Sequence, residues 1–457
     1  MSRPISDATE APRHDEELHR RILSGQARVG VVGLGYVGLP LSHALHEGGL
    51  EVLGFDVDDA KIDDLAAGRC YLEHFGEERT DVLARSERFS ATADFGRLGE
   101  VDAVLICVPT PIGGHGEPDL RYVLDAARLC GSTLRPGQLF VLESTTYPGT
   151  TRREFLGALQ EAYAGADLLE PGRDFFVAYS PEREDPGRSS HSTRTIPKLV
   201  GGIDERSTAL ASALYGFGVE DVVPVSSAEV AEAAKLLENI FRAVNIALVN
   251  ELKVILDAMG IDVWEVVEAA STKPFGFMPF HPGPGLGGHC IPIDPFYLSW
   301  KAREVGRPTR FIELAGEINT SMPSYVVHKT MVALNEEGKA LNGSRVLVLG
   351  LAYKPDVDDT RESPSFEIIE ELTAKGARVD YHDSHVPRSK PVRRHDLGLE
   401  SVPLTAEALA LYDAVVITTD HSDVDYATVG RSARLIVDTR NALGRRGIAA
   451  SGRLVKA

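Results

Sequence analysis

One stretch of the chain constrains its fold more than any other. Residues 28–56 read RVGVVGLGYVGLPLSHALHEGGLEVLGFD: an apolar strand, a glycine-rich turn, a helix closed by Gly48 and Gly49, and a second strand that ends at Asp56. The change from a continuous apolar run to helical spacing and back is typical of a βαβ unit with parallel strands. The stretch therefore predicts an α/β domain.

Three glycines of this unit, Gly33, Gly35 and Gly38, fit the pattern G-x-G-x-x-G between a strand and a helix. Such glycines permit a tight turn, a close approach of the backbone to a pyrophosphate and close helix packing. Asp56 ends the next strand, where a carboxylate accepts from the ribose hydroxyls and repels a 2′-phosphate. The unit predicts a dinucleotide site that prefers NAD to NADP. A simple turn residue at the strand end is the alternative for Asp56.

The strand pattern continues beyond this unit. Strand-like runs at 102–109, 138–144 and 174–181 alternate with helical stretches, which indicates a parallel sheet covered by helices. A second strand, turn, helix, strand and aspartate follow at 344–383, with further strands at 413–420 and 434–439. The turn GLAYKPD of this second unit lacks the second and third glycines, so we do not expect it to bind a dinucleotide in the same way.

A long helix is predicted between these α/β parts, over residues 226–259. Ser226 and Glu229 form a capping-box signature, apolar residues recur at helical spacing, and Gly260 supplies the stop. A helix of roughly 50 Å exceeds a typical domain. We expect it to link domains or to pack against a second subunit.

A chain of 457 residues is too long for one hydrophobic core. The pattern predicts an α/β fold with two Rossmann-like doubly wound domains joined by a central helical domain that contains one long helix. The expected boundaries are a frayed polar N-terminal extension (1–27), an NAD-binding Rossmann domain (28–222), a central helical domain (223–335) and a C-terminal Rossmann-like domain (336–457).

Charge and cysteine content exclude several classes of function. The net charge of −19, with no basic run, argues against nucleic acid or an anionic membrane as a partner. Residues 1–26 lack the apolar core of a signal peptide, and 240–256 is too short and too charged to span a bilayer, so we expect a cytoplasmic protein. The sequence contains no C-x-x-C pair of the kind that binds metal. We therefore expect reduced thiols at all four cysteines, Cys70, Cys107, Cys130 and Cys290.

The segment 283–295, GPGLGGHCIPIDP, is too rich in glycine and proline for an ordinary helix or strand. It contains Cys290 and, four residues on, Asp294. Most free cysteines are small buried apolar residues, and we expect this of the other three. The glycine-rich segment offers little side-chain mass to bury Cys290, which favours a reactive thiol.

Further stretches of the chain, taken together, carry a family resemblance. They are CVPTP (107–111), ESTTYPGTT (143–151), SPEREDPG (180–187), the helix with Lys235 and Asn239, GGHCIPIDP (287–295) and GLAYKPDVDDTRESPS (350–365). With the glycine turn, and in this order over residues 28–440, the chain resembles the UDP-glucose/GDP-mannose 6-dehydrogenase family. The forms at 143–151, 180–187 and 283–295 look most like the branch that acts on UDP-N-acetylglucosamine and feeds bacterial polysaccharide synthesis.

The resemblance implies an enzyme that oxidises the C6 alcohol of a nucleotide sugar to a carboxylate. The implied reaction consumes two NAD and proceeds through two intermediates, an aldehyde and a cysteine thioester. UDP-N-acetylglucosamine is the expected substrate, with UDP-N-acetylgalactosamine, UDP-N-acetylmannosamine and UDP-glucose as alternatives. The C-terminal domain is expected to bind the nucleotide sugar, and a homodimer or higher homo-oligomer is expected.

The resemblance also implies roles for single residues. Cys290 matches the nucleophile, and Asp294 the base near the thiol and the attacking water. Lys235 and Asn239, one turn apart on the long helix, are expected to stabilise the alkoxide and the oxyanion. Glu182 is expected to position water against the thioester, and Thr145 to hold an ordered water. A solvated Lys235 and an exposed charged turn at residues 182–185 are the alternatives.

Binding roles follow in the same way. The expected cofactor residues are Gly33, Gly35, Tyr36, Val37, Gly38, Asp56, Val108, Pro109, Thr110 and Thr145. The expected substrate residues are Glu182, Lys235, Asn239, Lys273, Gly287, Tyr353, Lys354 and Arg361, with Tyr353 stacking on the uracil. The chain departs from the family at Lys273–Pro274, where an arginine from the neighbouring subunit is common, and at His289, where many members have serine. Whether Lys273 replaces the arginine is left open.

Two other functions fit parts of the sequence. A two-electron hydroxyacid dehydrogenase shares the βαβ unit and the long helix but explains neither Cys290 nor a third domain. A non-catalytic protein that binds nucleotide sugars keeps the fold, but the set of Cys290, Asp294, Lys235 and Glu182 argues against it.

Overall fold

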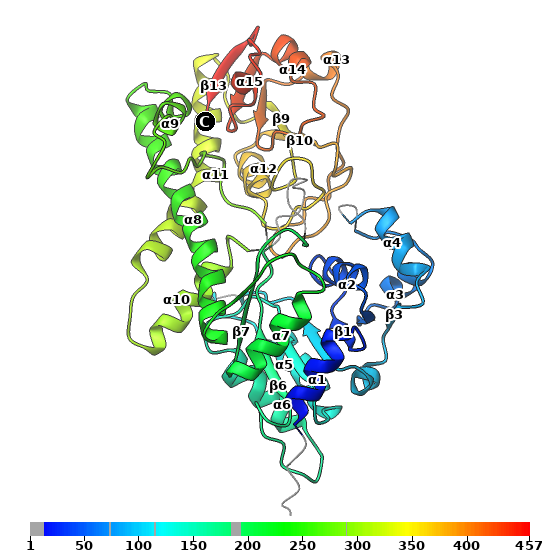
Figure 1. Cartoon of the computed structure of the whole chain (residues 1–457). Helices are drawn as coiled ribbons and strands as arrows, with labels where there is room; N and C mark the ends of the chain where they lie inside the picture. The colour runs from blue at the N-terminus through cyan, green and yellow to red at the C-terminus, as the bar shows by residue number, and fades with distance from the viewer. Residues whose placement is uncertain (1–12, 73–74, 114–115, 184–192, 289) are drawn as a thin grey trace, which may run out of the picture. The chain divides into compact units, whose positions relative to one another are not determined.

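The structure is a computed structural model, shown in Figure 1. It describes residues 13–72, 75–113, 116–183, 193–288 and 290–457. His289 and residues 184–185 of the charged turn lie outside this part. The chain forms two compact units, Met1–Leu236 and Leu237–Ala457, and the boundary falls inside the long helix α8 (Ala228–Ala258). These units do not test the predicted three-domain boundaries, which stay a prediction.

The first unit contains an eight-stranded sheet in the order β3-β2-β1-β4-β5-β6-β7-β8. Its strands are β1 (Arg28–Val32), β2 (Glu51–Phe55), β3 (Phe89–Thr92), β4 (Ala103–Ile106), β5 (Leu139–Leu142), β6 (Phe176–Tyr179), β7 (Lys198–Gly202) and β8 (Val222–Pro224). Neighbouring strands are parallel except β6 and β7. The order from β3 to β6 is that of a Rossmann fold, which confirms the predicted fold class.

Helices connect these strands. They are α1 (His14–Leu23), α2 (Gly38–Glu47), α3 (Asp59–Ala66), α4 (Glu77–Ala84), η1 (Phe95–Glu100), α5 (Arg121–Ser132), η2 (Thr151–Phe155), α6 (Leu156–Ala162) and α7 (Glu205–Tyr215). The expectation of a frayed extension up to residue 27 is wrong for α1. Its Leu18 and Ile22 lie one turn apart and are buried in the core, and its first turn is acidic and its last basic, as the helix dipole favours.

Helix α8 confirms the predicted long helix, and its 31 residues span about 46 Å. The predicted cap is wrong by one residue, because the backbone N–H of Val230 donates to Oγ of Ser227 and not of Ser226. Glu229 instead pairs with Arg152 at 2.6 Å. Gly260, with φ +72°, ends the helix as predicted.

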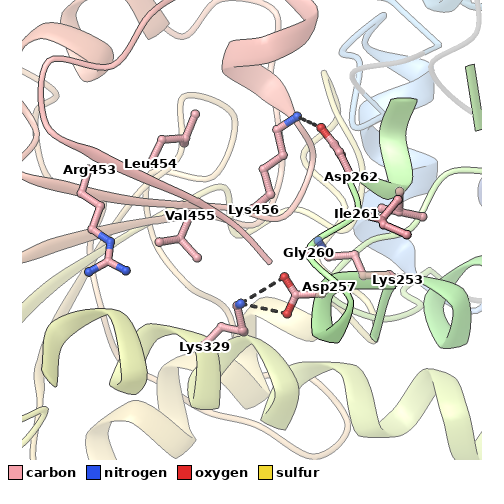
Figure 2. A pocket seen from close by; sticks show the side chains of 11 residues that line it. Lys253, Asp257, Gly260, Ile261, Asp262, Lys329, Arg453, Leu454, Val455 and Lys456 are labelled. Atoms are coloured by element: carbon pink, nitrogen blue, oxygen red, sulfur yellow. Dashed lines mark hydrogen bonds and ion pairs between the residues drawn. The ribbon is translucent and has the colours of Figure 1, made fainter. Parts of the chain in front are cut away.

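The second unit contains a five-stranded sheet, parallel throughout, in the order β10-β9-β11-β12-β13. Its strands are β9 (Arg345–Leu349), β10 (Arg378–His382), β11 (Ala414–Ile417), β12 (Leu435–Asp438) and β13 (Arg453–Lys456). Its further helices are α9 (Val263–Ser271), α10 (Asp294–Glu304), α11 (Arg310–Glu336), α12 (Pro364–Ala374), α13 (Ala406–Leu409), α14 (Tyr426–Ser432) and α15 (Ala442–Arg445). Lys456 on β13 binds Asp262, which precedes α9 (Figure 2).

The second glycine turn differs from the first at its strand-end acid. Asp383 follows β10 and accepts from the backbone N–H groups of Leu351 (2.6 Å) and Ala352 (2.9 Å) and from Nε2 of buried His421 (3.0 Å). Burial disfavours its charged form, but these hydrogen bonds and His421 lower the pKa of Asp383 to about 2. The carboxylate is thus held ionised between the end of β10 and the second glycine turn.

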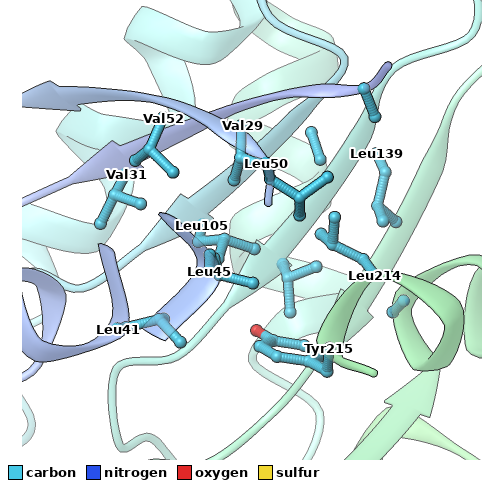
Figure 3. Close-up of a cluster of buried hydrophobic side chains, with 14 of the residues drawn as sticks. Val29, Val31, Leu41, Leu45, Leu50, Val52, Leu105, Leu139, Leu214 and Tyr215 are labelled. Atoms are coloured by element: carbon cyan, nitrogen blue, oxygen red, sulfur yellow. The ribbon is translucent and has the colours of Figure 1, made fainter. Parts of the chain in front are cut away.

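Both faces of each sheet are buried, as expected for parallel strands between helices. In the first unit, alternate residues of neighbouring strands, Val29, Val31 and Leu105 among them, pack against Leu41 and Leu45 of α2 (Figure 3). The opposite face carries a second cluster with residues such as Val104, Phe140 and Val177. Within the described residues, no helix is both long and apolar enough to cross a membrane.

Candidate active site

The first glycine turn has the geometry of a pyrophosphate cradle. Gly33 has φ +92°, and a Cβ there would lie 2.5 Å from the carbonyl oxygen of Cys107. A Cβ on Gly38 would collide with the carbonyl oxygen of Gly33, whereas a Cβ on Gly35 would meet no protein atom within 4 Å. Packing therefore requires two of the glycines, and the third leaves open space beside the N-terminus of α2. This space fits the pyrophosphate of NAD.

Asp56 lies buried at the end of β2, where a ribose-binding acid is expected. Its carboxylate accepts from the backbone N–H groups of Leu34 (2.9 Å) and Asp58 (3.0 Å) and binds Nζ of Lys61 at 3.1 Å. Lys61 was not among the predicted residues. The signal for it was a lysine five positions after the acid, at the start of the following helix. Lys61 and the two backbone N–H groups hold the Asp56 carboxylate in one orientation at the end of β2.

The other predicted cofactor residues gather at the carboxyl ends of adjacent strands. Tyr36 and Val37 follow β1, Val108, Pro109 and Thr110 follow β4, and Thr145 follows β5. Ser144 Oγ donates to the carbonyl oxygen of Val108 at 2.7 Å, so the segments after β4 and β5 are held together. The carboxyl edge of an open parallel sheet is where such folds bind their ligands.

A buried ionic cluster that sequence reasoning missed lies beside Glu182. Lys198 Nζ donates to Glu143 at 2.6 Å, the Tyr215 hydroxyl donates to the same carboxylate, and Lys198 lies 3.6 Å from Glu182. Burial alone would lower the pKa of Lys198, but Glu143 and Glu182 outweigh it and raise that pKa. The ammonium is thus retained and holds Glu182. The sequence feature that could have revealed this cluster is Lys198, a lysine at the start of the otherwise apolar run KLVGG.

The remaining thiols differ from Cys290 in their surroundings. The four cysteines are free. Burial raises the pKa of Cys130 to about 12. Burial, with the Glu143 carboxylate, raises the pKa of Cys107 well above its usual value. Both are therefore poor nucleophiles, although Cys107, like Cys70 and Cys290, is partly exposed and only Cys130 is buried.

The segment with Cys290 packs closely on the loop before α12. Gly288 has φ +85°, and its N–H donates to the carbonyl oxygen of Arg361 at 2.8 Å. A Cβ on Gly287 would lie 2.5 Å from Cβ of Tyr353, so a side chain there would separate the two segments. The carbonyl oxygen of Cys290 accepts from the N–H of Asp294 at 2.8 Å. Cys290 therefore lies just before the N-terminus of α10, whose dipole favours a thiolate.

Asp294 and Asn239, both predicted as catalytic, lie in contact. Asn239 Nδ2 on α8 donates to Oδ2 of Asp294 on α10 at 2.6 Å, and both side chains are buried. Lys235 lies one turn before Asn239 and is 7% exposed, so it is not the solvated lysine of the alternative. Asp294 is thus a buried carboxylate held in one orientation near the thiol.

The predicted substrate residues of the second unit fall in two places. Lys354 Nζ lies 5.7 Å from the ring centre of Tyr353, beside Gly288, and Arg361 makes a bidentate pair with Asp359 at 2.6 and 3.0 Å. These residues lie on the loop that packs against the Cys290 segment. Lys273 lies elsewhere in sequence, after α9, with Nζ 5.0 Å from the ring of exposed Phe275.

One group of side chains in the described residues has metal-ligand types close together, namely Asp356, His385, His421 and Asp423. His421 Nδ1 accepts from the backbone N–H of Asp356 at 3.0 Å, and its Nε2 donates to Asp383. Because both ring nitrogens of His421 are engaged, we assign no metal to this group.

Comparisons with known proteins agree along the chain. Family models of the UDP-glucose/GDP-mannose dehydrogenase family match its NAD binding domain at residues 27–217, its central domain at 229–321 and its UDP binding domain at 347–445. Protein CapL of Staphylococcus aureus is 36% identical over 90% of this chain and 95% of its own length. UDP-N-acetyl-D-glucosamine 6-dehydrogenase of Pseudomonas aeruginosa is 35% identical over 87% of this chain and 91% of its own.

Among solved structures, the UDP-D-ManNAc dehydrogenase from Pyrococcus horikoshii superposes with a TM-score of 0.83. It is 32% identical, over 94% of this chain and 99% of its own. The matched domains and the glycine turn together make NAD the cofactor. The chain therefore belongs to the UDP-glucose/GDP-mannose dehydrogenase family and is an NAD-dependent nucleotide-sugar dehydrogenase.

Proposed function

We propose that this protein oxidises the C6 alcohol of UDP-N-acetylglucosamine to the uronate through a thioester on Cys290. The observation that carries the proposal is the turn that ends at α10. It sets the thiol before a helix N-terminus and the buried Asp294 carboxylate, held by Asn239, one turn later. The 35% identity to the Pseudomonas aeruginosa UDP-N-acetyl-D-glucosamine 6-dehydrogenase supports the choice of sugar.

In the first half of the reaction the alcohol loses a proton and a hydride and becomes an aldehyde. The hydride acceptor in both halves is NAD, which the glycine turn and Asp56 would hold. The Lys235 ammonium and the Asn239 amide stabilise negative charge on the C6 oxygen as its proton leaves. Thr145, after β5, holds the water that takes up this proton.

In the second half the Cys290 thiolate adds to the aldehyde carbon and forms a thiohemiacetal. Loss of a second hydride gives a thioester, and water then releases the carboxylic acid and the free thiol. Asp294 accepts the proton of the attacking water, and Glu182, held by Lys198, positions that water. Lys354 and Arg361 bind the diphosphate and sugar end of the substrate, and Tyr353 stacks on the uracil.

The stoichiometry of NADH tests the reaction class. We expect two NADH for each UDP-N-acetylglucosamine consumed, with one equivalent of uronate by mass spectrometry. One NADH per sugar would indicate a two-electron dehydrogenase and contradict the proposal. Absence of NADH with every UDP- and GDP-sugar tried would instead indicate a binding protein.

The sugar itself is tested by a comparison of kcat/KM. UDP-N-acetylglucosamine is expected to exceed UDP-N-acetylmannosamine, UDP-N-acetylgalactosamine and UDP-glucose. UDP-N-acetylmannosamine is the second candidate. The Pyrococcus horikoshii structure, which matches this chain with a TM-score of 0.83, is named as a UDP-D-ManNAc dehydrogenase. A higher kcat/KM for this epimer would replace the proposed substrate and leave the reaction class intact.

A further inference from the structure

A polar cavity lies in the second unit, apart from every residue assigned above to the active site. It is a pocket open to solvent, of about 320 Å³, between the C-terminal end of α8, the residues before α9, helix α11 and strand β13 (Figure 2). Its charged lining residues are Lys253, Asp257, Asp262, Lys329, Arg453 and Lys456. Pockets of roughly 300–1,000 Å³ hold small ligands, so this one suits a ligand at the small end of that range.

The lining carries more positive than negative charge, although the chain as a whole has a net charge of −19. Four cations face two carboxylates. Lys329 donates to both oxygens of Asp257, at 2.9 and 3.1 Å, and Lys456 binds Asp262. Both carboxylates are thus neutralised by partners in the pocket, and Arg453 is itself paired with Glu336 and lies 3.6 Å from Glu337, so Lys253 is, in the described part of the chain, the lining cation left without an acidic partner.

Lys253 is this unpaired cation. Its side chain is 3% exposed, and among the residues that the structure describes its ammonium has no hydrogen-bond partner and no carboxylate oxygen within 4.0 Å. Asp257, one turn on, is already bound by Lys329 and by the Tyr325 hydroxyl at 2.8 Å. Burial lowers the pKa of Lys253 to about 8. A buried cation without a counterion is costly, and an anion in the cavity would offset that cost.

We infer that this cavity is a binding site for a small phosphate-bearing anion, with the Lys253 ammonium as its inner donor. Lys329, Lys456 and Arg453 line the same space, each paired with a carboxylate, so the unpaired Lys253 ammonium supplies the charge that the anion would balance. Phosphate suits the site because its several oxygens accept from converging ammonium groups. None of its lining residues belongs to the glycine turn or to the loop with Lys354 and Arg361, so the site uses none of the residues assigned to NAD and the nucleotide sugar.

Binding of phosphate to the full-length protein tests this site. Isothermal titration calorimetry with inorganic phosphate is run with saturating NAD and UDP, which fill the other anion sites, and at ionic strength matched with chloride. We expect saturable binding to the wild type and at least about tenfold weaker binding to Lys253→Met, because a charge-assisted hydrogen bond is lost. Lys375→Met is the matched control, since it removes an exposed lysine directly after α12 that pairs with Glu371, and its affinity should equal that of the wild type.

A second variant guards against misfolding of the first. Lys456→Gln removes a cation from the rim and should weaken phosphate binding several-fold. Because the Lys253 ammonium loses its proton near pH 8, binding should also weaken between pH 7 and pH 9. Glycerol 3-phosphate in place of phosphate distinguishes a phosphorylated metabolite from the free ion by which of the two binds more tightly. No saturable binding of either, or equal affinity in the wild type, Lys253→Met and Lys456→Gln, would overturn the inference.

Discussion

Cys290 owes its expected reactivity to its place in the chain more than to its residue type. Cys107 and Cys130 carry the same thiol, but their surroundings hold their pKa values high, whereas Cys290 lies directly before the N-terminus of α10. Cys290→Ser should lower the rate of uronate formation by at least about a thousandfold, since serine is a far weaker nucleophile at neutral pH. NAD affinity, measured by fluorescence titration, should not change.

The control for this variant is Cys70→Ser, which removes another partly exposed thiol and should leave turnover unchanged. Stalled Cys290→Ser should yield aldehyde or its adduct, detected by trapping with hydroxylamine. Normal uronate formation by Cys290→Ser would remove the covalent step from the mechanism.

Lys198 is the residue on which the buried cluster beside Glu182 depends. Lys198→Met would leave the Glu143 carboxylate buried without its cation, and removing one partner of a buried pair typically costs about 3–5 kcal/mol. We expect the free energy of unfolding in urea to fall by that order. In the double variant with Glu143→Gln, the amide still accepts from Tyr215 and no charge is stranded, so the loss should be smaller. Equal losses in both would show that the pair is not coupled.

Between elements, Glu232 ties helix α8 to the start of η2. Its buried carboxylate accepts from the N–H of Gly149 (2.6 Å) and from the N–H (2.9 Å) and hydroxyl (2.7 Å) of Thr151. Glu232→Ala leaves these donors buried and unpaired, which should cost at least about 2 kcal/mol of unfolding free energy in urea. Glu229→Ala, on the same helix, removes the exposed pair with Arg152 and a partly exposed contact with Ser227, and should cost no more than about 1 kcal/mol. Similar losses in both would contradict this role of Glu232.

The elements that sequence reasoning predicted are those with strong local signals. The glycine turn, the end of α2 and the end of α8 each need a glycine with positive φ, and this requirement can be recognised from the local sequence alone. Strand β7 was missed because its burial comes from pairing with distant strands, and its lysine reads as a surface residue until Glu143 and Glu182 are placed around it. Helix α1 was missed because a polar segment with only two buried residues looks like a tail.

Local sequence patterns also leave part of the candidate active site unpredicted. Motifs named Asn239 and Asp294, but their hydrogen bond depends on the packing of α8 against α10, which no local pattern encodes. Lys61 and Lys198 lie outside the family motifs and emerge only from contacts across the sheet or into the next helix.

For the whole molecule, one surface of α8 bears on how many chains assemble. The large apolar side chains exposed on it include Leu237, Phe241, Leu248, Leu252 and Ile255, and exposed Met259 follows directly after the helix. At 3.6 residues per turn they lie within about 60° of one another around the helix, in the narrow stripe of a helix that packs against another helix. Exposed apolar patches of this kind mark interaction surfaces. We propose that the stripe packs against a second copy of the chain.

A glutamate in the middle of the stripe tests this proposal. The wild type should have at least twice the monomer mass of 49.4 kDa by light scattering, and Leu248→Glu should shift it to the monomer, because a buried charge at a helix seam has no partner. Arg242→Glu, at an exposed position on a different side of α8, is the control and should leave the mass unchanged. If Leu248→Glu keeps the wild-type mass, or if the wild type is itself a monomer, α8 does not form the interface, and the apolar stripe needs another explanation.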